Sequence, residues 1–261
     1  VRIGKRLTLA LNESAVFGNL EPELLRDTNV FTVFHNWTIP ERSNSLLSAE
    51  ATWTPWRRFF VYGQFSIDEF TTTYEAEAGG GAGPGVFGWL AGINGSYPLG
   101  PGYLGAWAEA ASTSPWLYNR RASPYYYNVR RYWSIADNAF VWVTKPIGYE
   151  YGPDAVVGAF NLDWKVPAGP SVALNILSVT TGQTDILSAW APAAGDTAPT
   201  GDTPELLLAI ALEGAFPVLP WLRASAGATW VSRRNQGNLA DADSDTMELY
   251  LGLSASTGLP R

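Results

Sequence analysis

The stretch ELLLAIALEGAF at residues 205–216 decides the fold predicted for this 261-residue chain. Its alternate residues form one wholly aliphatic set and a second set that ends in a charge. The first set is Leu206, Leu208, Ile210 and Leu212, and the second is Leu207, Ala209, Ala211 and Glu213. A side-chain period of two is the period of a β-strand. The stretch therefore predicts a strand whose two faces meet different surroundings.

Two later segments follow the same rule, LRASAGATWVSR at 222–233 and MELYLGLSAS at 247–256. In both, one face carries apolar side chains, and the other is rich in Gly, Ser and charged residues. Strands of about ten residues with one apolar and one polar face are typical of transmembrane β-barrels, in which the strands separate lipid from a wet lumen. The three segments together predict an all-β fold, a transmembrane antiparallel β-barrel.

The rest of the chain fits a single outer-membrane barrel domain over residues 1–261, with about twelve strands. The predicted hairpins pair 45–54 with 59–68, 87–97 with 104–112, 156–166 with 171–180, and 205–216 with 222–233. Short Pro-rich turns alternate with long polar loops, as periplasmic turns and outer loops do in bacterial barrels. Two segments differ: Glu21–Asp27 predicts one or two helical turns, and Tyr132–Val143 predicts one weak strand.

The composition excludes several classes of function. A net charge of −7 and a pI near 4.8 argue against nucleic-acid binding, which needs a basic surface. The chain has no cysteine, so it has no disulfide, thiolate nucleophile or cysteine-based metal site, and we expect neither a metal nor a cofactor. No apolar run is long enough for a transmembrane helix. Twelve Trp and twelve Tyr provide the amphipathic rings that favour membrane interfaces.

A soluble β-sandwich is the alternative, because its strands also alternate between apolar and polar residues. Aromatic residues at the strand ends and the contrast between short turns and long loops favour the barrel. The expected location is the bacterial outer membrane, and the expected partners include its lipid and lipopolysaccharide.

Ten charged residues are predicted to face the lumen of the barrel. They are Arg6, Glu50, Asp68, Glu109, Asp163, Lys165, Glu213, Arg223, Arg233 and Glu248. Such charges either line a pore that selects solutes or pair with one another and stiffen the lumen. The sequence leaves both alternatives open, and a general diffusion porin is accordingly the second functional hypothesis.

No catalytic residue is predicted, and the chain is not expected to be an enzyme. His35 is the sole histidine, and no G-x-S-x-G motif accompanies it, so the basis for an outer-membrane hydrolase is missing. The acidic residues of Asp241–Asp245 lack the Gly and Glu positions of an EF-hand, which predicts a solvated loop.

Residues 114–131, SPWLYNRRASPYYYNVRR, do not alternate and predict a cationic, aromatic loop at the extracellular mouth. The candidate polysaccharide-binding residues are Trp116, Tyr118, Arg120, Arg121, Tyr125, Tyr126, Tyr127, Arg130 and Arg131. Aromatic faces stack on sugar rings and guanidinium groups bind carboxylates, so an acidic polysaccharide suits both. The alternative is that these residues lie at the headgroup level and bind lipopolysaccharide or nothing.

Several blocks resemble the capsule-assembly Wzi-like family. They are LNESAVFGNLEPELL at 11–25, NSLLSAEATWTPWRRFFVYGQFSIDEF at 44–70, PYYYNVRRYWSI at 124–135 and KPIGYEYGPDAVV at 145–157. The second contains the family's N-S-x-x-S and Y-G-Q-x-x-x-D-(D/E)-F pattern, and the last contains its P-(L/I)-G and G-P-(D/N)-A pattern. The resemblance implies an outer-membrane barrel that binds surface polysaccharide as a lectin and helps to assemble or retain it at the cell surface.

Overall fold

The computed structural model describes residues 1–17, 43–69, 85–119, 128–136, 139–188 and 198–255. This part of the chain is all-β. Its strands are β1 (Arg2–Ile3), β2 (Leu7–Phe17), β3 (Ser43–Trp56), β4 (Phe59–Glu69), β5 (Val86–Leu99), β6 (Gly102–Thr113), β7 (Asn128–Ala136), β8 (Ala139–Pro146), β9 (Ala155–Lys165), β10 (Ser171–Thr181), β11 (Glu205–Leu219), β12 (Leu222–Arg234) and β13 (Ser244–Ala255). A 3-10 turn, η3 (Gln236–Asn238), precedes β13. No helix of the described residues is long and apolar enough to cross a bilayer.

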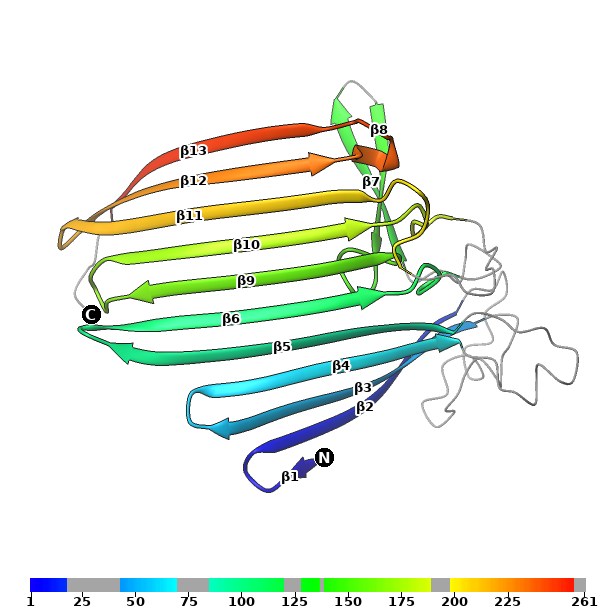
Figure 1. Cartoon of the computed structure of the whole chain (residues 1–261), viewed down its shortest axis with the longest axis horizontal. Helices are drawn as coiled ribbons and strands as arrows, with labels where there is room; N and C mark the ends of the chain where they lie inside the picture. The colour runs from blue at the N-terminus through cyan, green and yellow to red at the C-terminus, as the bar shows by residue number, and fades with distance from the viewer. Residues whose placement is uncertain (18–42, 70–84, 120–127, 137–138, 189–197, 256–261) are drawn as a thin grey trace, which may run out of the picture.

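Eleven strands form one antiparallel sheet in the order β1-β2-β3-β4-β5-β6-β9-β10-β11-β12-β13. The hairpin β7–β8 is a separate two-stranded sheet between β6 and β9 in sequence (Figure 1). The turns β3–β4, β5–β6, β9–β10 and β11–β12 lie together at one end of the sheet, which we call the short-turn end (Figure 1). The longer connections lie at the opposite end, which we call the loop end.

The structure confirms the predicted all-β class, the four hairpins and the contrast between short turns and long connections. One prediction was wrong: Tyr132–Val143 is not a single strand, because it falls across the hairpin of β7 and β8. The polar dipeptide Asp137-Asn138 separates these two strands in the sequence. The predicted helical turns at Glu21–Asp27, and His35, lie outside the described residues.

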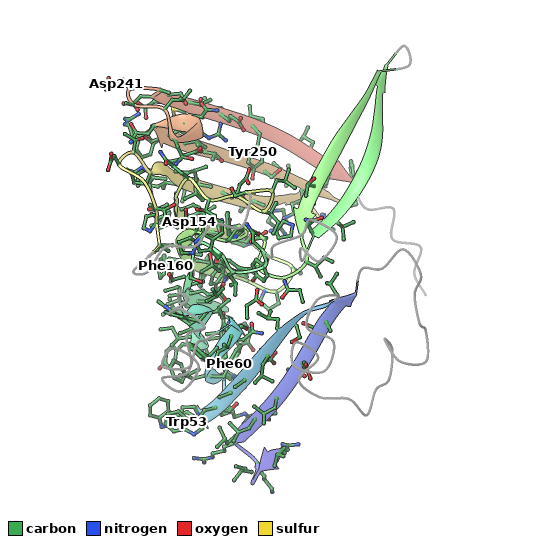
Figure 2. All side chains as sticks on the ribbon, turned by 90° about the vertical axis from the view of Figure 1, so that its right-hand side faces the viewer. Trp53, Phe60, Asp154, Phe160, Asp241 and Tyr250 are labelled. Carbon is green, nitrogen blue, oxygen red and sulfur yellow. The ribbon has the colours of Figure 1, made fainter. Side chains whose placement is uncertain are left out.

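Among the described residues the large sheet is open. β13 is one edge and β1 with β2 is the other, and these two edges do not pair. Leu251 of β13 is accordingly 89 % exposed, whereas Leu212 of the interior strand β11 is 54 % exposed. Figure 2 shows the sheet as a twisted and curved layer with the β7–β8 hairpin to one side of it.

The two faces of the large sheet differ in chemistry because opposite residues of neighbouring strands share a face. Phe160, Ile176 and Ile210 are cross-strand neighbours, and their side is the apolar face. Asn161 and Asn175 are cross-strand neighbours on the opposite side, the polar face. In Figure 2, Phe160 lies on one side of the sheet and Tyr250 on the other. The apolar face and the polar face are therefore each continuous from strand to strand across the large sheet.

A small core forms where the chain after β6 folds back at the loop end. Trp116, Leu117 and Tyr118 are buried there against Val86. A side chain at Gly88 would place its Cβ 2.8 Å from Leu117 Cδ2, so the close approach of Leu117 to β5 requires glycine. The turn that carries these aromatic residues is thus fixed to the sheet.

Candidate functional site

The predicted lumen charges mostly share the polar face. The strand register places these residues on it: Glu50, Glu109, Asp163, Lys165, Glu213, Arg223, Arg233 and Glu248. Asp68, two residues after Ser66 of the same strand, is buried at the loop end and accepts a hydrogen bond from the Tyr118 amide at 3.1 Å. Arg6 lies in the turn before β2. That this face bounds a lumen stays a prediction.

The charged groups of the polar face have both neutral and charged partners. Glu50 accepts hydrogen bonds from Asn12 Nδ2 and Gln64 Nε2, each at 3.2 Å. Lys165 forms an ion pair with Asp163 at 3.1 Å. Arg223 donates instead to a hydroxyl, Ser171 Oγ, at 2.8 Å. The contacts of Glu50 join neighbouring strands, that of Arg223 joins β12 to β10, and the Lys165–Asp163 ion pair lies within β9. The polar face thus combines hydrogen bonds with ion pairs, whereas one of the two predicted alternatives was the pairing of charges with one another.

Tyr62 and Glu109 form the central contact of the polar face. The register aligns Tyr62 of β4, Gly92 of β5 and Glu109 of β6 in one row. A Cβ at Gly92 would lie 2.3 Å from Tyr62 Cζ, so the missing side chain lets the phenol ring cross β5. The Tyr62 hydroxyl then donates to Glu109 Oε2 at 2.7 Å. Glycine between an aromatic residue and a carboxylate thus creates a contact two strands apart.

The same order of tyrosine, glycine and glutamate across three strands recurs near the β13 edge of the sheet. Tyr250 of β13, Gly227 of β12 and Glu213 of β11 are cross-strand neighbours. A Cβ at Gly227 would lie 2.3 Å from Tyr250 Cε1, so this ring also lies over a glycine. The polar face therefore carries aromatic rings that lie along the sheet, and Tyr250 is labelled on that face in Figure 2.

A cavity of about 270 Å³ opens beside Glu109, and we call it the inner groove. Its polar and aromatic lining consists of Trp107, Glu109, Tyr149, Glu150, Tyr151 and Asn175. Asn161 Nδ2 donates to Asn175 Oδ1 at 2.7 Å and so orients the amide at one wall. Aromatic faces, a carboxylate and an amide here surround one hollow, a combination that suits a ligand rich in hydroxyl groups.

The segment between β8 and β9 holds two tyrosines over this groove. The Tyr149 amide donates to the buried Tyr118 hydroxyl at 3.1 Å, and the Gly152 amide donates to the Tyr149 carbonyl at 2.9 Å. Thr113 Oγ1 of β6 in turn donates to the Gly152 carbonyl at 2.9 Å. The rings of Tyr149 and Tyr151 lie 5.6 Å apart. These hydrogen bonds attach the segment to both the buried core and the sheet.

The Tyr149 phenol remains protonated at neutral pH. Burial raises its pKa, and the negative charge of Glu109 raises the pKa further. Tyr149 therefore keeps a hydroxyl proton that a bound ligand could accept. The pKa of Tyr151 is raised as well, first by burial and then by Glu150.

Asp154 fastens the loop end of the sheet. It is fully buried in the described structure and adopts a left-handed backbone with φ of 58°. Its carboxylate accepts hydrogen bonds from the Thr184 amide at 2.9 Å, from the Thr200 amide at 2.8 Å and from the Thr200 hydroxyl. This residue, labelled in Figure 2, thereby ties the β10–β11 connection to the start of β9. Its role is structural.

The predicted polysaccharide-binding loop is only partly described. Trp116 and Tyr118 are 8 % and 4 % exposed, so both rings are packed inside the protein and do not form an exposed stacking surface. These two rings are not free to stack on a sugar in the described structure, and their role in polysaccharide binding stays a prediction. Arg120, Arg121, Tyr125, Tyr126 and Tyr127 lie outside the described residues. Arg130 and Arg131 belong to β7, but only their backbone is described.

Sequence reasoning missed the aromatic residues of the inner groove. Trp107 alternates onto the polar face of a predicted strand, and this position could have been noted from the period alone. Tyr149 and Tyr151 belong to the KPIGYEYGPDAVV block, but no local pattern indicates that they fold onto β6 and β9. Long-range packing brings them to the groove.

The acidic loop before β13 is engaged in ion pairs. Arg234 Nη2 lies 3.0 Å from Asp245 Oδ2, and Arg234 Nε lies 3.8 Å from Asp243 Oδ2. Across the described residues, no group of three or more His, Asp or Glu side chains is placed to hold a metal ion. The carboxylates of this loop thus neutralise an arginine.

The class defined by these observations is an all-β protein with one large amphipathic antiparallel sheet and an aromatic, carboxylate-containing groove on the polar face. No protein-family model matches the chain, and comparison with the curated proteins and with the solved structures gives no match. The resemblance to the capsule-assembly family accordingly stays a prediction from the sequence blocks.

Proposed function

We propose that the chain is an integral protein of the bacterial outer membrane, of the capsule-assembly type, that binds a surface polysaccharide on the polar face of a β-barrel. The observation that carries the proposal is the inner groove, in which Trp107 and two tyrosines surround the carboxylate of Glu109. The polysaccharide would be assembled or retained at the cell surface by this contact.

The apolar face supports the membrane half of the proposal. Large residues on this face are open to the surroundings: Leu212 is 54 % exposed and Phe160 is 36 % exposed, and both lie on interior strands. Soluble monomers rarely expose a continuous apolar patch of more than a few hundred Å². A face of this kind across eleven strands calls for lipid or another apolar partner.

The length of the apolar face also fits a bilayer. Phe87 and Tyr97 lie ten residues apart on the apolar face of β5, a distance of about 33 Å along the strand. At a strand tilt of about 40° this corresponds to a height of about 25 Å, which is the usual height of the apolar band in outer-membrane barrels.

Insertion into a bilayer requires that the edges of the sheet be paired, because an unpaired backbone cannot remain in hydrocarbon. Within the large sheet, β2 to β6 and β9 to β13 alternate in direction, so β2 and β13 run antiparallel to each other. Pairing of these two strands would give an even-numbered antiparallel barrel, the form that bacterial barrels take. β1 covers the edge of β2 only as far as Leu9.

The charge of the inner groove decides which kind of glycan it suits. Glu109 and Glu150 contribute two carboxylates, and none of the described residues that line the groove is basic. Like charges repel, so an anionic glycan would be disfavoured at this position. A neutral polysaccharide can stack on Trp107 and donate hydroxyl hydrogen bonds to Glu109. We therefore propose a neutral glycan for the groove, in contrast to the acidic one suggested by the arginine-rich loop.

The test is a calorimetric titration of the detergent-purified chain with neutral glucan oligosaccharides and, separately, with oligogalacturonate. We expect the neutral chains to bind, and we expect Trp107→Leu and Glu109→Gln each to weaken their binding about tenfold or more. Trp230→Leu is the matched control, since Trp230 lies on the apolar face. Equal loss in the control, or no binding by the parent of either glycan, would reject the proposed site.

A general porin is the second candidate, favoured by the exposed carboxylates Glu213 and Glu248 on the polar face away from the groove. A porin conducts ions steadily in a planar bilayer, whereas a barrel that retains a glycan without transporting solutes need not. Large, stable conductance steps that oligosaccharide does not block would favour the porin over the glycan-binding protein.

A further inference from the structure

A second hollow lies on the apolar face at the short-turn end, and we call it the turn groove. It has a volume of about 440 Å³. It lies between the β3–β4 turn and the part of the β5–β6 hairpin that is nearest to the short-turn end. Its walls are Phe59, Ile93, Tyr97, Leu104 and Phe160. The groove is thus apolar and faces the same surroundings as the rest of the apolar face.

Small residues form the floor of the turn groove. Gly95 of β5 lies between Phe59 of β4 and Ala106 of β6 in the strand register, and Ala108 follows on the same face. A Cβ at Gly95 would lie 3.1 Å from Phe59 Cδ2, so glycine keeps the floor low beside that ring. Larger side chains on both sides then leave an elongated channel that can hold a hydrocarbon chain.

Two arginines stand at the mouth of the turn groove. Arg57 and Arg58 belong to its lining, and within the described part of the chain neither forms an ion pair. The Arg58 guanidinium lies 5.6 Å from the centre of the Tyr103 ring, a cation–π distance. The Arg58 carbonyl accepts a hydrogen bond from the Ser96 amide at 3.0 Å, which fixes the turn to β5. Two positive charges are therefore positioned without a counter-charge from the described residues.

Charge is distributed unequally between the two ends of the sheet. Besides Arg57 and Arg58, the short-turn end carries Lys5 and Arg6 in the turn before β2. The loop end carries the carboxylates Asp185, Asp202 and Asp241, besides Asp243 and Asp245, which pair with Arg234. Basic residues at one membrane surface attract anionic lipids, at about 1 kcal/mol for each Lys or Arg. The positive end is also the end where the turn groove opens.

We propose that the turn groove binds one molecule of an anionic phospholipid, with an acyl chain on Gly95 and Ala106 and the phosphate against Arg57 and Arg58. The proposal rests on the membrane location proposed above. Its chemistry combines both halves of the ligand: an apolar channel for the chain, and guanidinium donors that match phosphate oxygens bidentately. Because the site lies at the short-turn end, its occupant comes from the leaflet that contacts that end.

The experiment is native mass spectrometry of the full chain in non-ionic detergent, with phosphatidylglycerol or phosphatidylcholine of identical acyl chains. We expect phosphatidylglycerol to be retained over phosphatidylcholine, with about fivefold preference from each arginine. R57Q/R58Q should abolish the preference, whereas K5Q/R6Q, which removes the same charge from the neighbouring turn, should keep it. A106F should reduce retention of the lipid although both arginines remain.

Three results would overturn the proposal: an unchanged preference in R57Q/R58Q, an equal loss in K5Q/R6Q, or full lipid retention in A106F with the fold intact by circular dichroism. Excess inorganic phosphate distinguishes a lipid site from a simple phosphate site, because it should compete only weakly with a lipid held by its acyl chain. Flotation of the chain with phosphatidylcholine vesicles tests the membrane location separately. Flotation without a phosphatidylglycerol preference would reject the lipid site alone, and absence of flotation would reject the membrane location.

Discussion

Leu212→Arg tests whether the apolar face meets lipid. Leu212 lies at the middle of β11, seven residues from each end of a strand that runs from Glu205 to Leu219. Seven residues span about 23 Å along a strand, or about 18 Å of height at a tilt of about 40°. The strand thus extends beyond an apolar band of about 25 Å, whose midplane lies about 12 Å from either edge, too far for an arginine side chain at Leu212 to reach the headgroups. An arginine there should therefore cost about 2–4 kcal/mol in a bilayer, the range for arginine at the midplane of a barrel.

Glu213→Arg is the matched control because it introduces the same side chain one residue further along, on the polar face. Glu213 is exposed, so we expect a change of less than about 0.5 kcal/mol. The measurement is guanidinium unfolding of vesicle-reconstituted protein, followed by tryptophan fluorescence. The difference between the two variants reports mainly on the face, because both introduce the same side chain at adjacent positions of one strand, although Glu213→Arg changes the formal charge by two and Leu212→Arg by one.

The soluble alternative gives a different result. If the apolar face of the described sheet were exposed to water, then Leu212, which is 54 % exposed, would accept arginine at a cost of about 0.5 kcal/mol or less. If another protein layer covered that face, the variant would be destabilised in detergent-free solution as well as in vesicles. Near-equal unfolding of Leu212→Arg and Glu213→Arg in vesicles would refute the assignment of the apolar face to lipid.

Three further outcomes follow from the loop end. Asp154→Ala should lower the free energy of unfolding by about 3 kcal/mol, because the part-buried Thr184 and Thr200 amides lose the buried carboxylate that accepts their hydrogen bonds, and hydrogen exchange at those amides should increase. Gly88→Ala should cost about 1–3 kcal/mol by contact with Leu117, and Leu117→Ala in the same chain should recover part of the loss, which a double-mutant cycle would measure. Tyr149 has a raised pKa in the folded state, so its contribution to stability is complete below pH about 10 and is lost as pH rises through the folded pKa. In a pH titration followed by tyrosinate absorbance, Tyr149→Phe should accordingly have one tyrosine fewer that ionises above the usual pH range.

Local patterns were sufficient to predict the four hairpins of the large sheet and its last strand, β13. Leu206, Leu208 and Ile210 alternate with smaller or polar residues, and β11 follows from that period alone because one face must meet a different environment. Turns are local to within a few residues: Pro217 pairs with Arg223 inside β11 instead of ending it, and the turn lies at Pro220 and Trp221. The hairpins were therefore predictable, and their ends differ from the predicted ones by only a few residues.

The site was less predictable because it depends on contacts between distant segments. Trp116 and Tyr118 look like an exposed sugar-stacking pair in sequence, but they are buried against Val86 by a turn that no periodicity describes. Tyr62 and Glu109 are 47 residues apart and meet because Gly92 lies between their strands. Alternation assigned Tyr62 and Glu109 to the same face, but it could not show that their side chains touch. Only the pairing register of β4, β5 and β6, which aligns the two residues with Gly92, shows that contact.

Glu109 is the residue that separates the two glycan hypotheses. An anionic sugar about 6 Å from its carboxylate would be repelled by about 3 kcal/mol at an effective dielectric constant of about 20, more than a stacking contact of about 1 kcal/mol would return. A neutral sugar at the same position feels no such repulsion and can donate a hydrogen bond to Glu109, which the Tyr62 hydroxyl already orients. The arginines that suggested an acidic ligand belong to a different segment, residues 120–131. Selectivity for neutral over acidic glycans should therefore decrease in Glu109→Gln, because that variant removes the repulsion and keeps the side-chain shape.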